Sequence, residues 1–116
     1  VPVSAVIILN NKIISKAYNK RTKTHNVLAH AEVRCITKAA RKLKDWRLDN
    51  CIMYVSLYPC SLCQEVIKES RIKEVYYILK NPETKNQKTS FKQLKISKNI
   101  YLKFENNICS FFKKMR

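Results

Sequence analysis

Two short motifs hold side chains that zinc prefers as ligands. His30 precedes Glu32 by two residues, and Pro59 is followed by Cys60 and Cys63 in a Cys-x-x-Cys pair. Imidazole and thiolate are common zinc ligands, and a zinc ion with three protein ligands keeps its fourth position for water, as in catalytic sites. We therefore expect His30, Cys60 and Cys63 to form one catalytic zinc site.

The spacing along the chain accounts for Cys60 and Cys63 at one metal ion, but it does not account for Glu32 at the same place. Residues three apart lie about 300° around a helix, nearly on one face, and Pro59 favours a helix start where free N–H groups stabilise thiolates. His30 and Glu32 are about 200° apart on an ideal helix, so their spacing alone does not bring both to one metal. A redox pair or half of a structural zinc knuckle remain alternatives for Cys60 and Cys63, and the upstream His-x-Glu argues against them.

The other cysteines and the second histidine fit structural positions better than the metal site. Cys35, Cys51 and Cys109 lie within apolar patterns, where a small buried side chain is expected. His25 lies in a polar segment, so we expect it to face solvent or substrate instead of serving as a fourth ligand. No export signal is visible, and a reducing cytoplasm is the expected compartment.

The elements that must position these residues follow from the hydrophobic pattern. Apolar and alternating runs predict strands at 3–9, 12–18, 51–57, 73–79 and 100–104. Amphipathic patterns predict helices at 29–44, 61–70 and 108–115, with Val33, Ile36, Ala40 and Leu43 on the apolar face of the first. Helices packed on a mixed sheet are the expected arrangement, with a tight turn at Asn10-Asn11 and loops at 19–28 and 81–90.

The charge favours a polyanionic partner. The chain has 116 residues and a formal net charge of +16, which attracts nucleic acid. Its length suits one compact domain, and no apolar run approaches the roughly 20 residues of a membrane-spanning helix.

In these residues the chain resembles the bacterial tRNA-specific adenosine deaminases, which convert the wobble adenosine of an anticodon to inosine. The zinc motifs alone are typical of the wider cytidine-deaminase-like superfamily. Flanking segments indicate the tRNA branch, and the resemblance extends over residues 1–116. These segments are Pro2-Val3-x-Ala5-Val6, Asn10-Asn11, Asn19, Arg47-Leu48, Tyr54-Val55-x-Leu57, Ser70-Arg71-Ile72 and Phe111-Phe112-Lys113-Lys114-x-Arg116.

The resemblance implies both a fold and a set of roles. The fold is of the α/β class, a three-layer α/β/α cytidine-deaminase-like sandwich with a mixed five-stranded sheet. One Zn2+ per chain is held by three residues, with His30 at the very start of its helix and Glu32 reaching around to transfer protons. The implied partner is the anticodon loop of tRNA, bound by a homodimer in the cytoplasm, without a membrane. Implied contacts to the substrate are Asn19, Ala31 and Asn81.

Departures from the family pattern concern recognition more than metal chemistry. Tyr58 stands where the family often has Glu, and Lys80-Asn81 replaces the usual Arg-Asp pair. We expect residues 1–116 to be a single zinc-dependent deaminase domain that lacks the family's first helix and has a shortened C-terminal helix. Two alternatives remain, namely a deaminase of a free nucleobase, nucleoside or nucleotide, and a zinc-containing RNA-binding protein without catalysis, for which Glu32 would have no use.

Overall fold

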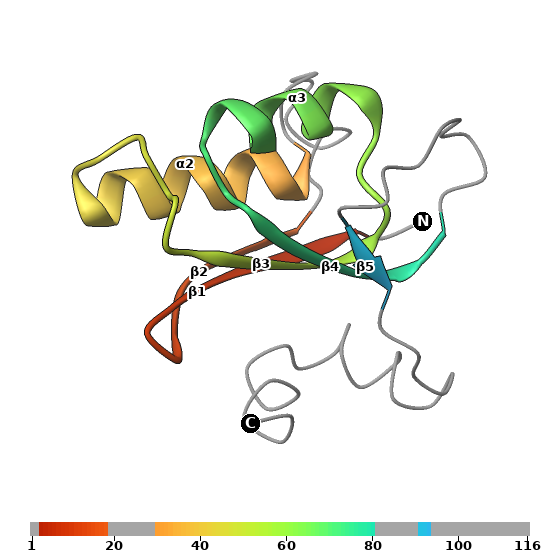
Figure 1. Ribbon diagram of the computed structural model, residues 1–116, viewed down its shortest axis with the longest axis horizontal. Coiled ribbons are helices and arrows are strands. Elements are labelled where there is room, and N and C mark those ends of the chain that lie inside the picture. The colour runs from red at the N-terminus through yellow and green to blue at the C-terminus, as the bar shows by residue number, and fades with distance from the viewer. Residues whose placement is uncertain (1–2, 19–29, 81–90, 94–116) are drawn as a thin grey trace.

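A five-stranded sheet carries two helices on one of its faces (Figure 1). The computed structural model describes residues 3–18, 30–80 and 91–93. The strands lie in the order β2-β1-β3-β4-β5, and the two helices connect β2 to β3 and β3 to β4. The elements are β1 (Ser4–Leu9), β2 (Lys12–Tyr18), α2 (Ala31–Leu43), β3 (Ile52–Leu57), α3 (Ser61–Glu69), β4 (Glu74–Leu79) and β5 (Lys92–Gln93).

The sheet is mixed, as the sequence predicts. β1 pairs antiparallel with β2 and with β3, whereas β4 pairs parallel with both β3 and β5. Asn10 and Asn11 have φ values of 51° and 63° in the turn between β1 and β2, the pair of left-handed residues that a tight hairpin turn requires. The parallel pairing of β3 and β4 places the ends of both strands on one edge of the sheet, and α3 connects them.

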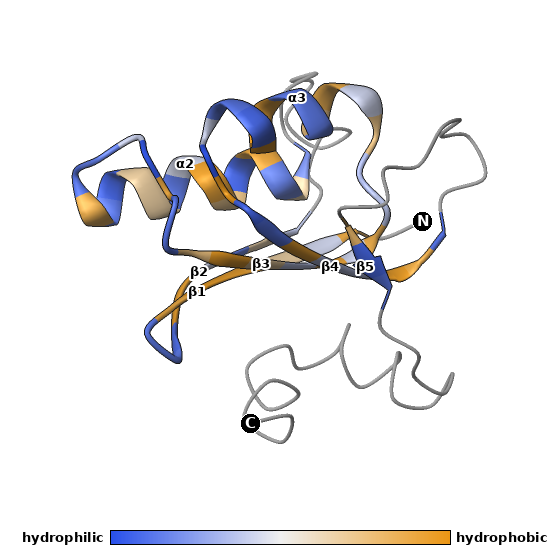
Figure 2. Ribbon diagram, viewed as in Figure 1, coloured by the Kyte–Doolittle hydropathy of each residue, from blue (hydrophilic) through white to orange (hydrophobic). Residues whose placement is uncertain are grey.

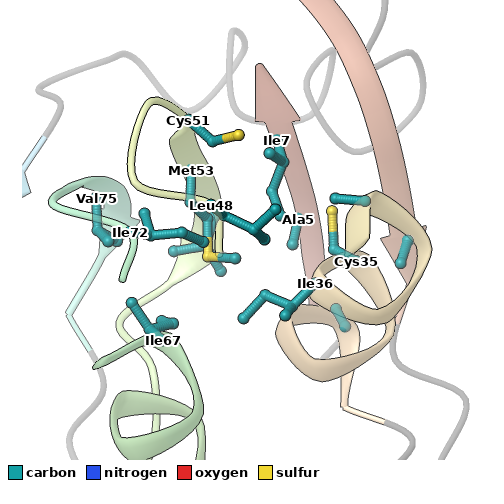
Figure 3. Close-up of a cluster of buried hydrophobic side chains, with 14 of the residues drawn as sticks. Ala5, Ile7, Cys35, Ile36, Leu48, Cys51, Met53, Ile67, Ile72 and Val75 are labelled. Atoms are coloured by element: carbon teal, nitrogen blue, oxygen red, sulfur yellow. The ribbon is translucent and has the colours of Figure 1, made fainter. Parts of the chain in front are cut away.

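The core lies between the sheet and the helices. Figure 3 shows Ala5 and Ile7 of β1 facing Ile36 of α2, with Met53 and Ile67 on the other side of the cluster. Side chains that alternate along β1, Val6 and Ile8, point to the opposite face of the sheet and are also buried. Burial on both faces is what a three-layer fold requires.

The apolar face predicted for α2 is displaced from the observed one. Of the four residues expected there, Ile36 is buried, whereas Val33, Ala40 and Leu43 are only half-buried. The observed buried face consists of Ala31, Glu32, Cys35, Ile36 and Ala39. The small side chains in this set let α2 lie close to the sheet. On the side away from the sheet, both helices carry hydrophilic residues (Figure 2).

The fifth strand differs from the prediction. The strand beside β4 is Lys92–Gln93, two exposed residues without an apolar pattern, so hydrophobic periodicity gives no signal for it. The strand predicted at 100–104 and the helix predicted at 108–115 lie outside the described residues. Neither α2 nor α3, the helices in the described ranges, is long and apolar enough to cross a bilayer.

Candidate metal centre and active site

The candidate ligands come from the starts of two helices that begin at the same end of the molecule (Figure 1). His30 immediately precedes α2, with φ −69° and ψ 147°, and Cys60 immediately precedes α3, with φ −69° and ψ 171°. Both residues are extended, and neither side chain caps its own helix. Cys63 lies in the first turn of α3 and is buried. The expectation that His30 stands at the very start of its helix is therefore confirmed.

The three donor atoms are close enough to share a metal ion. One ligand atom each from His30, Cys60 and Cys63 lies within 4.8 Å of the others, and the distance between His30 Nδ1 and Cys60 Sγ is 3.8 Å. Tetrahedral zinc with ordinary bond lengths to nitrogen and sulfur separates such a pair by about 3.6 Å. The donor set and its spacing therefore fit zinc, with a nitrogen and two sulfurs and the fourth position left for water.

The electrostatics of Cys63 also favour a cation at this point. Burial raises the pKa of the Cys63 thiol far above its usual range, and the nearby Glu32 carboxylate and Cys60 raise it further. A thiolate at this place needs a compensating positive charge, which a bound divalent ion provides.

Glu32 is a buried carboxylate beside this centre. Its side chain is buried, with 4% of its surface exposed, in the first turn of α2, and it shares a hydrogen bond with Cys63. Burial raises the pKa of Glu32, and the hydrogen bonds to its own backbone N–H and to Cys63 oppose that rise. Within residues 3–18, 30–80 and 91–93 no salt bridge neutralises it, since the ion pair found there joins Arg47 and Asp45. A buried acid next to a metal site, with no salt bridge to it among the described residues, is suited to holding and releasing a proton.

The predicted substrate contacts are only partly covered by the structure. Ala31 is the first residue of α2 and is fully buried, next to His30. Asn19, Asn81 and His25 lie outside the described residues. Whether these side chains contact a substrate stays a prediction.

The cysteines expected to be structural are buried where the structure describes them. Cys35 and Cys51 are 0% and 4% exposed, and Cys109 lies outside the described residues. Ser15 Oγ donates to the carbonyl of Cys35 at 2.9 Å and lies 3.1 Å from its sulfur. Burial raises the pKa of Cys35 to about 12, so this thiol stays protonated at neutral pH.

Tyr58, the residue before the Pro-Cys-x-x-Cys motif, has a packing role that sequence reasoning missed. Its side chain is fully buried, and its ring lies edge-on to Tyr77 at 4.8 Å and beside Phe91 at 5.5 Å between centroids. Its backbone N–H donates to the carbonyl of Leu79 at 2.9 Å. These contacts hold the chain in place just before Cys60. In the sequence, the apolar run that leads into Pro59 was the signal that Tyr58 is buried.

Comparison with known proteins places the chain among deaminases. A family described as "Cytidine and deoxycytidylate deaminase zinc-binding region" matches residues 1–79. A tRNA-specific adenosine deaminase of Buchnera aphidicola is 34% identical over the whole chain and 78% of its own length. A protein of the same description from Bacillus subtilis is 38% identical over 66% of this chain. A guanine deaminase of Bacillus subtilis is 41% identical over 66% of the chain.

A solved structure from a study of A-to-I editing by tRNA:A34 deaminases superposes with a TM-score of 0.71. That match has 28% identity and covers 79% of this chain and 82% of the other. The chain spans about half of several relatives it matches, with 48% for the tRNA-specific deaminase and 49% for the guanine deaminase of Bacillus subtilis.

Proposed function

We propose that this chain hydrolyses adenosine to inosine at the wobble position of tRNA. It belongs to the zinc-binding cytidine and deoxycytidylate deaminase family, and within that family to the tRNA-specific adenosine deaminases. The observation that carries the proposal is the buried Glu32 carboxylate beside His30, Cys60 and Cys63. A zinc protein that only bound RNA would have no need of such a carboxylate, because burying an ionisable acid costs stability.

Zinc bound by these three side chains supplies a nucleophile at neutral pH by lowering the pKa of water and polarising it. The chain's own contribution is the placement and the proton transfer. The Glu32 carboxylate accepts a proton as water adds to the carbon that bears the amino group, and delivers it to a ring nitrogen. It then takes the remaining proton from the hydroxyl on that carbon and passes it to the amino group, so that the carbonyl of inosine forms as the C–N bond breaks and ammonia leaves.

The burial of Glu32 supports this role through its effect on proton affinity. A desolvated carboxyl holds its proton more tightly than an exposed one, and a nearby cation weakens that hold. With zinc held by His30, Cys60 and Cys63, the Glu32 carboxyl would be able both to accept a proton and to release it, which a two-way transfer requires. Asn19 and Asn81 complete the proposal as contacts to the nucleoside, with the backbone of Ala31 at the base.

The proposed partner is the anticodon loop of tRNA. The chain has 24 Lys and Arg residues against 8 Asp and Glu. A relative aligned over the whole of this chain and 78% of its own length is a tRNA-specific adenosine deaminase. An unpaired loop suits an enzyme that must take its base out of the stack, and many cations suit a phosphate backbone. We include in the proposal that the enzyme works as a homodimer in the cytoplasm, which light scattering of the purified protein and localisation of a tagged chain would test.

Inosine mapping on total tRNA tests the proposal. Zinc-loaded protein is incubated with tRNA that bears adenosine at the wobble position, and reverse transcription reports inosine as guanosine. We expect conversion at that position alone, slowed by at least about 10²-fold in Glu32→Gln. No conversion by zinc-loaded, folded protein would contradict the proposal.

Deamination of a free base is the second candidate, because a guanine deaminase is 41% identical over two thirds of this chain. Ammonia release from guanine, measured beside that from the tRNA, separates the two candidates. Turnover of guanine without conversion of tRNA would favour the second.

A further inference from the structure

A cleft lies along the side of α3, and Gln64, the residue after Cys63, is part of its lining. The volume of the cleft is about 270 Å³. Nε2 of Gln64 donates to the carbonyl of Pro59 at 3.0 Å. Arg71 and Lys73, which follow the helix, line the cleft as well. The helix rises about 9 Å between Cys63 and Glu69, so a few nucleotides span the distance from the metal centre to Arg71.

The lining has the chemistry of a nucleotide site. Its apolar part consists of Ile67, Ile72 and Phe91, and its cations are Lys68, Arg71 and Lys73. All three cations are exposed. Among the residues that the structure describes, no acidic residue lines the cleft and none of the three cations is in a salt bridge. The volume of about 270 Å³ is near the lower end for ligand pockets, so the cleft has room for a small group such as one nucleotide and not for a folded partner.

Trp46 extends this surface beyond Arg71. It is 60% exposed, and the guanidinium carbons of Arg47 and Arg71 each lie 5.9 Å from its ring centroid. The backbone N–H of Leu48 donates to the carbonyl of Ser70 at 2.8 Å, which ties the Trp46 segment to the end of α3. An exposed aromatic ring beside fixed cations is the arrangement on which unpaired bases stack.

We propose that the α3 cleft and Trp46 form a second RNA-binding surface, which holds the strand that flanks the base in the active site. The cations of the cleft hold phosphates, one nucleotide occupies the cleft, and an unpaired base stacks on Trp46. Phosphate groups complement the three exposed cations of the cleft, which favours RNA as the occupant. The inference rests on the proposed function for the identity of the RNA.

The test compares two double variants that remove the same charge. Arg71→Asn with Lys73→Gln removes two cations of the cleft, and Asn tolerates the φ of 70° that Arg71 adopts. Lys12→Gln with Lys42→Gln removes two exposed cations that do not line the cleft. Affinity for a fluorescent RNA stem-loop bearing the wobble adenosine is measured by anisotropy at several salt concentrations.

We expect the cleft variant to bind the stem-loop about tenfold more weakly, with a salt slope shallower by about 1.4, since each phosphate contact on a single strand contributes about 0.7. The control variant should change affinity by less than about twofold, because its charges act only at long range. Trp46→Ala should weaken binding about five- to tenfold, and Trp46→Phe should restore most of the loss, because a ring is needed for stacking.

The outcomes separate this inference from the proposed function. Equal affinities for the cleft and control variants, with tRNA still converted by the wild type, would overturn the second surface and leave the function standing. Loss of binding in the cleft variant, with no conversion of tRNA by the wild type, would support the surface and remove the function. A changed oligomeric mass with unchanged RNA affinity would assign the surface to contact between copies and overturn the inference. The thermal unfolding and the zinc content of each variant show whether it folds. If the double variant of the cleft does not fold, Trp46→Ala still tests the RNA-binding surface.

Discussion

Replacing Lys44 by glycine should stabilise the protein. Lys44 directly follows α2 with φ 55° and ψ 36°, in the left-handed region, and it is exposed. Its N–H donates to the carbonyl of Arg41 at 3.3 Å, and the N–H of Asp45 donates to that of Ala40 at 3.1 Å. This pair of hydrogen bonds defines a common C-terminal helix cap, in which glycine usually occupies the position that Lys44 holds here. The chain contains no glycine, so a residue with a Cβ takes that conformation.

The expected gain follows from two opposing terms. A left-handed conformation costs a residue with a Cβ about 1–2 kcal/mol, and glycine loses about 0.5–1 kcal/mol more backbone entropy on folding. The difference leaves Lys44→Gly more stable by about 0.5–1 kcal/mol. For a domain of this size, that gain raises Tm by about 2–5 °C.

The assay is urea and thermal unfolding of zinc-loaded protein, with Lys44→Ala as the matched control. The control removes the same charge and the same side chain beyond Cβ, and it keeps the Cβ that causes the strain. We expect stabilisation by Lys44→Gly alone. Equal stability of the two variants would show that the backbone conformation carries no cost here, and the reasoning would be refuted.

Three further predictions concern the site and the core. Cys60→Ala or Cys63→Ala should lower bound zinc from about one per chain to near zero in metal analysis, since two ligands do not retain a catalytic ion; retained zinc would contradict the assignment. Glu32→Gln should keep zinc and lower kcat on tRNA by at least about 10²-fold, the usual effect of losing a general acid–base; near wild-type turnover would show that another group transfers the proton. The free energy of unfolding should fall as pH rises above about 9, because folding raises the pKa of the Cys35 thiol from 9.0 to about 12. Above about pH 9 the unfolded thiol releases a proton that the folded thiol keeps. Cys35→Ala should remove that part of the slope in urea unfolding from pH 8 to 10, and an unchanged slope would contradict it.

Local patterns in the sequence predicted most of the described elements. The strand Lys12–Tyr18 has the predicted bounds, and α3 ends one residue before the predicted Ser70. These elements follow from hydrophobic runs and from turn and helix-start residues, which act within a few positions along the chain. The predicted left-handed turn at Asn10-Asn11 is confirmed for the same reason.

The face of α2 shows where periodicity fails. The sequence placed Val33, Ala40 and Leu43 on the apolar face, yet all three are only half-buried. Ala39, which the pattern did not place there, is fully buried together with Ala31 and Cys35. Which side of a helix meets the sheet depends on how closely the two pack, and small side chains allow the closest approach. The two-residue β5 escaped prediction because its pairing with β4 is made by backbone groups and leaves no mark on residue type.

For the candidate site, the sequence alone determined which donor groups are available, because one imidazole, two thiols and a carboxylate favour zinc and proton transfer wherever they meet. Only the tertiary structure decided that the start of α2 lies beside the start of α3, with Nδ1 of His30 facing the sulfur of Cys60. It also decided that Glu32 is buried against Cys63, and that Trp46 lies over Arg71, twenty-five residues away along the chain. Side-chain chemistry belongs to each residue, whereas the distances between residues are set by the packing of both helices on one sheet.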